Sequence, residues 1–177
     1  MDGKDIRTYT HEQRTEKIGF ILQEPFLFSG TLQENIVYGN NKYLHSTKEE
    51  ITELLKKSDL LGLLDKFEGG LDTPIVTSSD SMSLGQKQII AFARAYLRSP
   101  ELLILDEATA NIDTVTEQLL EDILKKLPKR TTRVIIAHRL NTIENADEIY
   151  FVNSGKVQRA GSLDDAVNLL LHGKRDS

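Results

Sequence analysis

Three apolar runs in this sequence end on side chains that can handle phosphate, water or a metal ion. The runs cover residues 18–22, 102–105 and 134–137, and they are followed by Gln23, by the pair Asp106 and Glu107, and by His138. Continuous apolar runs are typical of parallel strands buried on both faces, and such sheets bind ligands outside the carboxyl ends of their strands. We therefore expect these polar side chains to share one edge of a sheet.

The adjacent carboxylates carry more weight than the single glutamine and histidine. A lone polar residue after a strand is often a plain loop residue, and an acidic residue there often caps the next helix. Asp106 and Glu107 would repel each other at the end of a buried strand unless a cation or bound water offsets their charge. The pair therefore favours a functional site.

A second feature is the segment Met82-Ser83-Leu84-Gly85-Gln86, which opens a long apolar pattern. Ser83 and Gln86 have the spacing of a capping box and could do no more than satisfy free amides of the helix. The same amides, with a serine hydroxyl and a glycine that permits close approach, could instead bind a phosphate. The segment alone does not decide between these interpretations.

Short apolar runs alternate with amphipathic segments, which indicates an α/β sheet covered by helices. The predicted strands are 18–22, 102–105, 134–137, 149–152 and 156–160, and the predicted helices are 47–58, 83–98, 113–127, 140–145 and 162–172. Asn153-Ser154-Gly155 predicts a hairpin turn, because Asn and Gly tolerate positive φ. Residues 31–72 are expected to be helical throughout, without a strand.

Composition excludes several classes of protein. The chain has 177 residues, of which 39% are hydrophobic, so it can build a core. A net charge of -5 argues against a nucleic-acid binder, since phosphate binding needs clustered Lys and Arg. There is no cysteine for a disulfide or thiolate metal site, and the longest apolar stretch, 89–97, is far shorter than a membrane span. Partners should be proteins or small molecules.

Taken together, these motifs resemble the ATP-binding cassette (ABC) ATPases. Residues 83–86 look like the signature motif of the family, 102–107 like its Walker B strand with the following glutamate, 110–113 like its D-loop, and 137–139 like its switch-histidine loop. Gln23 lies where the family has its Q-loop glutamine. Residues 23–28 and 31–36, together with 137–140, look most like the exporter branch, whose ATPase domains usually follow a membrane domain.

The resemblance implies an α/β fold, a truncated P-loop NTPase-like core with a mostly parallel sheet plus an α-helical subdomain. The expected division is a core start with the Q-loop at 1–30, a helical subdomain with the signature at 31–99, and a core with Walker B, D-loop, switch histidine, hairpin and last helix at 100–177. A second such ATPase domain and a transmembrane domain are the implied partners, and the cytoplasmic face of the membrane is the implied location.

The resemblance also implies roles for the polar residues, with ATP and Mg²⁺ as ligands. Asp106 and Gln23 would hold the metal, Glu107 would orient or deprotonate the attacking water, and His138 would contact the γ-phosphate. Asp113 would organise the interface between two domains. The signature residues Ser83, Leu84, Gly85 and Gln86 would close over ATP held by the opposite domain.

The sequence departs from the family at two places. Met82 and Leu84 replace the usual Leu and Gly of the signature, and the bulk of Leu84 could weaken backbone approach to a phosphate. No stretch has a glycine, four residues and then Gly-Lys-Ser or Gly-Lys-Thr, the P-loop pattern. We therefore expect Met1 to begin inside the domain, apolar sheet surface to be open, and the chain alone to be inactive.

Two other functions compete with a shortened exporter ATPase. The chain could be a non-catalytic module that docks on an intact ATPase domain through its signature face. It could also be a chromosome-maintenance or repair ATPase of the same superfamily, although it has neither long heptad stretches nor basic patches.

Overall fold

The computed structural model describes residues 1, 3–77, 82–108, 112–137 and 144–172. The chain forms two compact units, Met1–Val134 and Ile135–Ser177. The first unit contains the signature segment, the adjacent carboxylates and Gln23. Residues 138–143, which include His138 and most of the predicted helix 140–145, lie outside the described residues, as do 109–111 of the D-loop segment.

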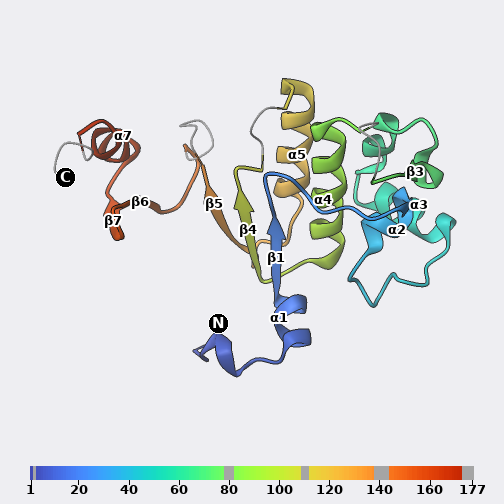
Figure 1. Cartoon of the computed structure of the whole chain (residues 1–177), viewed down its shortest axis with the longest axis horizontal. Coiled ribbons are helices and arrows are strands. Elements are labelled where there is room, and N and C mark those ends of the chain that lie inside the picture. Colours follow the sequence, from blue (N-terminus) through green and yellow to red (C-terminus); the bar gives the residue numbers. More distant parts are fainter. Residues whose placement is uncertain (2, 78–81, 109–111, 138–143, 173–177) are drawn as a thin grey trace. The chain divides into compact units, whose positions relative to one another are not determined.

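A three-stranded sheet carries the predicted site (Figure 1). Its strands are β1 (Ile18–Ile21), β4 (Leu102–Asp106) and β5 (Thr132–Ile136), in the order β1-β4-β5. β1 and β4 run parallel, with Ile18 opposite Leu102 and Ile21 opposite Leu105. The three predicted core strands are thus confirmed to within two residues at each end.

Only one face of this sheet is buried, so the prediction of strands covered on both faces is wrong. Burial alternates along β1, where Ile21 is buried whereas Phe20 is 62% exposed. Helix α4 (Leu84–Arg98) packs against β1. Val134 of β5 is also exposed, so the sheet has open apolar surface.

Helix α4 begins and ends at the residues that its sequence signals predict. Ser83 is its N-cap, and Ser99 ends it in a left-handed conformation one residue before Pro100. Its predicted apolar side is buried at Ile89, Phe92, Ala93 and Leu97, and half-buried at Tyr96. α4 contacts β1, α2 (Leu32–Val37) and α5 (Thr114–Lys125), so it joins the sheet to the helical part of the unit.

The region from 31 to 72 is not helical throughout, contrary to the prediction. Thr31 belongs to a two-residue strand, β2 (Gly30–Thr31), which pairs antiparallel with β3 (Pro74–Ile75). The region contains two α-helices, α2 and α3 (Lys48–Lys57), and Thr47 and Glu50 form a capping box at the start of α3. After α3 it holds short 3-10 turns, η2 (Leu61–Lys66) and η3 (Gly70–Asp72). Strands of two residues are too short to show an alternating pattern in a sequence.

Two further helical segments lie before β1 and were not predicted. These are η1 (Ile6–Thr8) and α1 (His11–Lys17). Thr10 and Gln13 form a capping box at the start of α1. Neither segment buries a residue. Without a buried face there is no apolar periodicity to reveal them.

The second unit is a hairpin followed by a helix. β6 (Ile149–Asn153) and β7 (Lys156–Ala160) pair antiparallel, and α7 (Leu163–His172) contacts both strands. Ser154 and Gly155 take positive φ, +49° and +75°, so the predicted turn is confirmed while Asn153 stays in the strand. None of the helices in the described ranges is long and apolar enough to cross a membrane.

Candidate functional site

The parallel strands β1 and β4 bring Gln23, Asp106 and Glu107 to one edge of the sheet, where both strands have their carboxyl ends. We call this edge the rim. Ile21 and Leu105 are the last paired residues. Asp106 is the final residue of β4 and Glu107 follows it, whereas Gln23 lies two residues beyond Ile21. Neighbouring strands lie about 4.8 Å apart, so the backbone places these three residues at the same end of adjacent strands.

Glu107 has an unusual backbone for a residue with a side chain. Its φ is +47°, in the left-handed region, which costs an L-residue roughly 1–2 kcal/mol. Glu107 and Asp106 are both half-buried. Strained conformations of this kind cluster at functional sites. The backbone conformation of Glu107 is therefore a second indication, besides its charge, of a functional role.

Gln88 of α4, which the sequence reasoning did not single out, holds the backbone at Gln23. Its side chain is 1% exposed. Its Nε2 donates to the carbonyl oxygens of Leu22 at 3.1 Å and of Gln23 at 2.7 Å. A glutamine on the otherwise apolar side of a helix was the available signal, because buried polar groups need partners.

The next part of the same loop is held by two more buried or half-buried polar side chains. Arg94 donates through Nη1 to the carbonyl of Phe26 at 3.0 Å and through Nε to the carbonyl of Asn35 at 2.8 Å. Asn35 is fully buried, accepts from the amide of Phe28 at 3.1 Å and donates to its carbonyl at 2.9 Å. Side chains of α2 and α4 therefore shape the segment that follows β1.

The signature segment forms the predicted capping box. Ser83 Oγ accepts from the amide of Gln86 at 3.2 Å, and Gln86 Oε1 accepts from the amide of Ser83 at 3.0 Å. Gln86 Nε2 also donates to the carbonyl of Lys66 at 2.9 Å. Ser83 is exposed and Leu84 half-buried, so the helix begins at an accessible surface where a phosphate interpretation stays open.

Asp113 caps α5 in the same manner. Its carboxylate accepts from the amide of Thr116 at 3.0 Å and from the Thr116 hydroxyl at 2.6 Å. These hydrogen bonds from Thr116 lower the pKa of the Asp113 carboxyl below its usual value. Asp113 therefore has a local structural role whether or not it also serves a domain interface.

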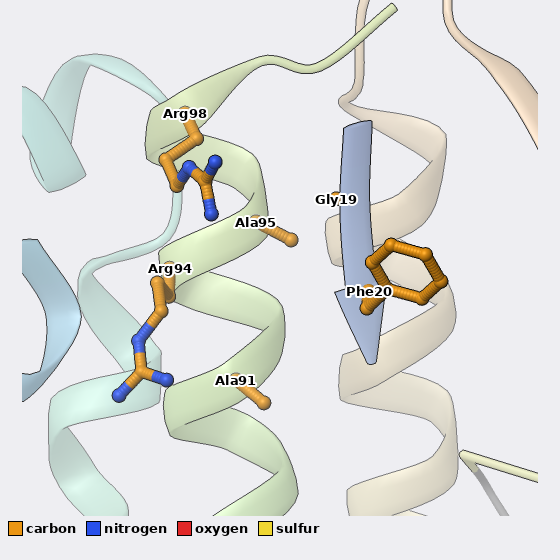
Figure 2. Close-up of a pocket in the computed structure, with 6 residues that line it drawn as sticks. All are labelled: Gly19, Phe20, Ala91, Arg94, Ala95 and Arg98. Carbon is orange, nitrogen blue, oxygen red and sulfur yellow. The ribbon is translucent and has the colours of Figure 1, made fainter. Parts of the chain in front are cut away.

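Two hollows on the chain do not match a nucleotide pocket. A cavity of about 30 Å³ lies between β1 and α4, lined by Gly19, Phe20, Ala91, Arg94, Ala95 and Arg98 (Figure 2). It has room for a water molecule or two, and Arg94 Nη2 is a buried donor with no partner among the described residues that such a water could satisfy. Burial lowers the pKa of both arginines there.

The larger hollow, about 480 Å³, lies along α3. Its lining includes three glutamates, Glu49, Glu50 and Glu53, which would repel phosphate groups. The described parts of the chain also contain no group of three or more acidic or histidine side chains that could hold a metal ion by themselves.

Comparison with known proteins identifies the family of this chain. The sequence profile described as ABC transporter matches residues 1–110. The chain is 43% identical over 167 residues to an uncharacterized ABC transporter ATP-binding protein, YfiC, of Bacillus subtilis, covering 94% of this chain and 27% of that protein. It is 37% identical over 169 residues to a probable multidrug resistance ABC transporter ATP-binding/permease protein, YheH, of the same organism, covering 96% and 25%.

A solved structure of a bacterial Atm1-family ABC exporter with ATP bound superposes with a TM-score of 0.77 at 30% identity, covering 99% of this chain and 29% of that chain. The chain therefore spans about a quarter of the length of these relatives. The α/β fold with its parallel strands and covering helices is that of the ABC ATPases. The chain belongs to the ABC transporter family and is homologous to the ATP-binding domains of its exporters.

Proposed function

We propose that this chain is part of an ATP-hydrolysing domain that drives transmembrane transport by an exporter. The observation that supports this most is the parallel register of β1 and β4, which ends both strands at one rim. There the chain offers two carboxylates and an amide.

Asp106 and Gln23 are the residues proposed to hold Mg²⁺. Carboxylate and amide oxygens are suitable ligands for Mg²⁺. This ion is commonly bound by one or two protein side chains, and substrate phosphates and water complete its coordination shell. The absence of a three-residue metal cluster among the described residues fits such an arrangement. When bound, the ion would neutralise charge on the phosphates of ATP.

Glu107 is proposed to orient or deprotonate the water that attacks the terminal phosphate. It follows Asp106 directly at the rim, with a left-handed backbone. His138 is proposed to contact the γ-phosphate and stabilise the charge that develops in the transition state. These are roles that the family resemblance gives to the matching positions of this sequence.

The signature segment is proposed to act on a second ATPase domain. Ser83, Leu84, Gly85 and Gln86 would close over ATP bound by that domain, so that two domains form composite sites, with Asp113 at their interface. A transmembrane domain would hold the pair at the cytoplasmic face of a membrane. The proposed subdomains remain 1–30, 31–99 and 100–177.

The chain by itself is proposed to bind ATP weakly and not to hydrolyse it. A P-loop supplies the amides and the lysine that grip the phosphates, and the 177 residues contain no such motif. The test is Mg²⁺-dependent ATP turnover by the purified chain, for which we expect no signal above background. Turnover that Glu107→Gln abolishes would contradict this inactivity while supporting the role of Glu107.

A second candidate is a docking module that modulates an intact ATPase domain without hydrolysing ATP. The same missing motif, together with an exposed Ser83, favours it. The two functions differ in whether the rim carboxylates matter. If the chain is catalytic, Glu107→Gln should abolish ATP hydrolysis by a domain in which an added P-loop segment completes this chain. If the chain only docks, the same substitution should leave the ATPase activity of an intact partner domain unchanged.

The signature role can be tested by mixing the chain with an intact exporter ATP-binding domain that holds ATP but cannot hydrolyse it. We expect an ATP-dependent complex on size exclusion. Ser83→Asp keeps an N-cap but places a negative charge against phosphate, so it should remove the complex. Ser162→Asp is the matched control, because Ser162 Oγ also accepts from a helix amide, that of Asp165 at 3.1 Å.

A complex that survives Ser83→Asp would contradict the proposed use of the signature segment. Loss of the complex in the Ser162→Asp control would show instead that a new charge anywhere disturbs association. Circular dichroism of both variants checks that their helices are intact.

A further inference from the structure

Gln88 connects the signature helix to the Gln23 loop. It lies five residues after Ser83 on α4, and its side chain reaches the two residues that follow β1. Both acceptors, the carbonyls of Leu22 and Gln23, lie beyond Ile21, the last residue of β1 that pairs with β4. The hydrogen bonds of Gln88 thus begin at the residue that follows the last pair of β1 and β4.

The chemistry fixes how the Gln88 amide is oriented. Both partners are carbonyl oxygens, which only accept, so the NH₂ group must face them and both of its hydrogens are used. This orientation leaves Gln88 Oε1 buried with no partner among the described residues. A buried unpaired acceptor costs free energy, so an apolar side chain of similar length would avoid a cost that glutamine incurs.

The stretch that Gln88 holds lies at the surface of the chain. Leu22 is 48% exposed and Gln23 is exposed, whereas Gln88 is 1% exposed. The two hydrogen bonds therefore tie exposed backbone to a buried side chain of α4, and so contribute to the direction in which this backbone runs.

We propose that Gln88 is a positioning residue that sets where Gln23 is presented at the rim beside Asp106. This inference rests on the proposed function, in which Gln23 contributes to the metal site. Because Gln88 and the signature residues share α4, the same helix fixes both the loop at Gln23 and the amides at Ser83. A displacement of α4 would thus carry Gln23 with it.

The test compares Gln88→Met, which keeps the length of the side chain but removes both donors, with Gln118→Met as a matched control on α5. Gln118 is exposed and donates only to Asp122 within its own helix. Backbone ¹⁵N relaxation is measured on the full chain, together with its unfolding by denaturant. We expect the amide order parameters of Gln23 and Glu24 to fall towards the flexible range, below about 0.6, in Gln88→Met, with those of Leu103 and Leu105 unchanged.

A second variant, Gln88→Glu, adds a readout that simple loss of packing would not move. An ionised carboxylate repels the two carbonyls, whereas a protonated one can donate to one of them. The order parameter of the Gln23 amide should be low while the Gln88→Glu carboxylate is ionised and should partly recover as the pH falls and this carboxylate is protonated. Gln88→Met should show no such recovery.

A third measurement separates this inference from the proposed function. Mn²⁺ alone is titrated into the protein, and broadening of the Gln23 and Asp106 amide signals is followed by NMR. In the wild type both signals should broaden, and in Gln88→Met the broadening at Gln23 should fall by half or more while that at Asp106 persists. If neither signal broadened in the wild type, the proposed metal site at Gln23 and Asp106 would be overturned. The positioning role of Gln88 would not be affected by that result.

Unchanged order parameters at Gln23 and Glu24 in Gln88→Met would overturn the positioning role. The same conclusion would follow if the order parameters of Leu103 and Leu105 in β4 fell as much, because Gln88 would then act through stability alone.

Discussion

Gly85, in the first turn of α4, lies directly against Thr116, in the first turn of α5. A β-carbon on Gly85 would stand 3.1 Å from Thr116 Cγ2 and 3.4 Å from Thr116 Oγ1. Thr116 is 4% exposed, and its hydroxyl donates to Asp113, so it has little freedom to move. The glycine therefore has a packing reason of its own, beside any close approach to a phosphate.

Gly85→Ala should lower the free energy of unfolding by about 1 kcal/mol. Overpacking a tight contact costs roughly 1–3 kcal/mol, and the better helix propensity of alanine returns at most about 1 kcal/mol of this. Chemical denaturation measures the change. The control is Gly85→Ala combined with Thr116→Ser, which deletes Cγ2 but keeps the hydroxyl that binds Asp113. With serine at position 116, Gly85→Ala should lower the free energy of unfolding much less than it does with threonine there. An equal loss with either residue would show that the contact between Gly85 and Thr116 is not the cause.

Glu107→Gly should raise the free energy of unfolding by about 1 kcal/mol. Glycine takes a left-handed backbone without the penalty that a β-carbon brings, and φ at Glu107 is +47°. Glu107→Ala is the matched control, because alanine also removes the carboxylate but keeps the β-carbon. Thermal denaturation should therefore rank glycine above alanine, and the opposite order would show that this backbone stores no strain.

Asn35→Ala should destabilise the chain by roughly 2–3 kcal/mol, because it leaves buried groups without partners. The Asn35 side chain accepts from the amide of Phe28 and donates to the carbonyls of Phe28 and Thr31. Asn41→Ala, at an exposed position, should change stability by less than about 0.5 kcal/mol. Denaturant midpoints compare the two, and a similar small effect in both would mean that the loop is held by other contacts.

Acidification should weaken α5 through Asp113. The pKa of this carboxyl is lowered in the folded state by hydrogen bonds from Thr116. The resulting stabilisation is present above the ordinary value of 3.8 and is lost as the pH falls through the lower folded pKa. The melting temperature should thus drop between pH 4 and pH 2.

Asp113→Asn is the control for this pH dependence, since asparagine keeps an N-cap but does not titrate. On the same acidification, the melting temperature of Asp113→Asn should fall less than that of the wild type. If both proteins fall equally, other carboxylates account for the acid sensitivity. The same variant suits any test of the proposed domain interface, because Asp113→Ala would also remove the cap.

The elements that the sequence predicted well are those with a buried face or a cap. α4 was predicted from Ser83, Pro100 and an apolar side, and α3 from its capping box. α1 was missed because it buries nothing, and β2 and β3 were missed because two residues carry no period. Continuous apolar runs gave the right strands but the wrong burial, since only one face of the sheet is covered in this chain.

The candidate site divides in the same way. Asp106, Glu107 and Gln23 could be proposed from the sequence, because abrupt polar ends of apolar runs are visible in it. Gln88, Arg94 and Asn35 could not, because their partners are backbone carbonyls of residues up to 68 positions away. A carbonyl is present in every residue, so no residue type marks it as an acceptor.

The sequence by itself determined which polar side chains the chain offers and which ends of its strands carry them, because side-chain type and apolar periodicity are local properties. Only the tertiary structure decided that β1 and β4 pair in parallel and end together, that Glu107 takes a left-handed backbone, and that α4 holds the loop at Gln23. These features depend on contacts between segments far apart in the chain, and such contacts exist only once the apolar faces have packed.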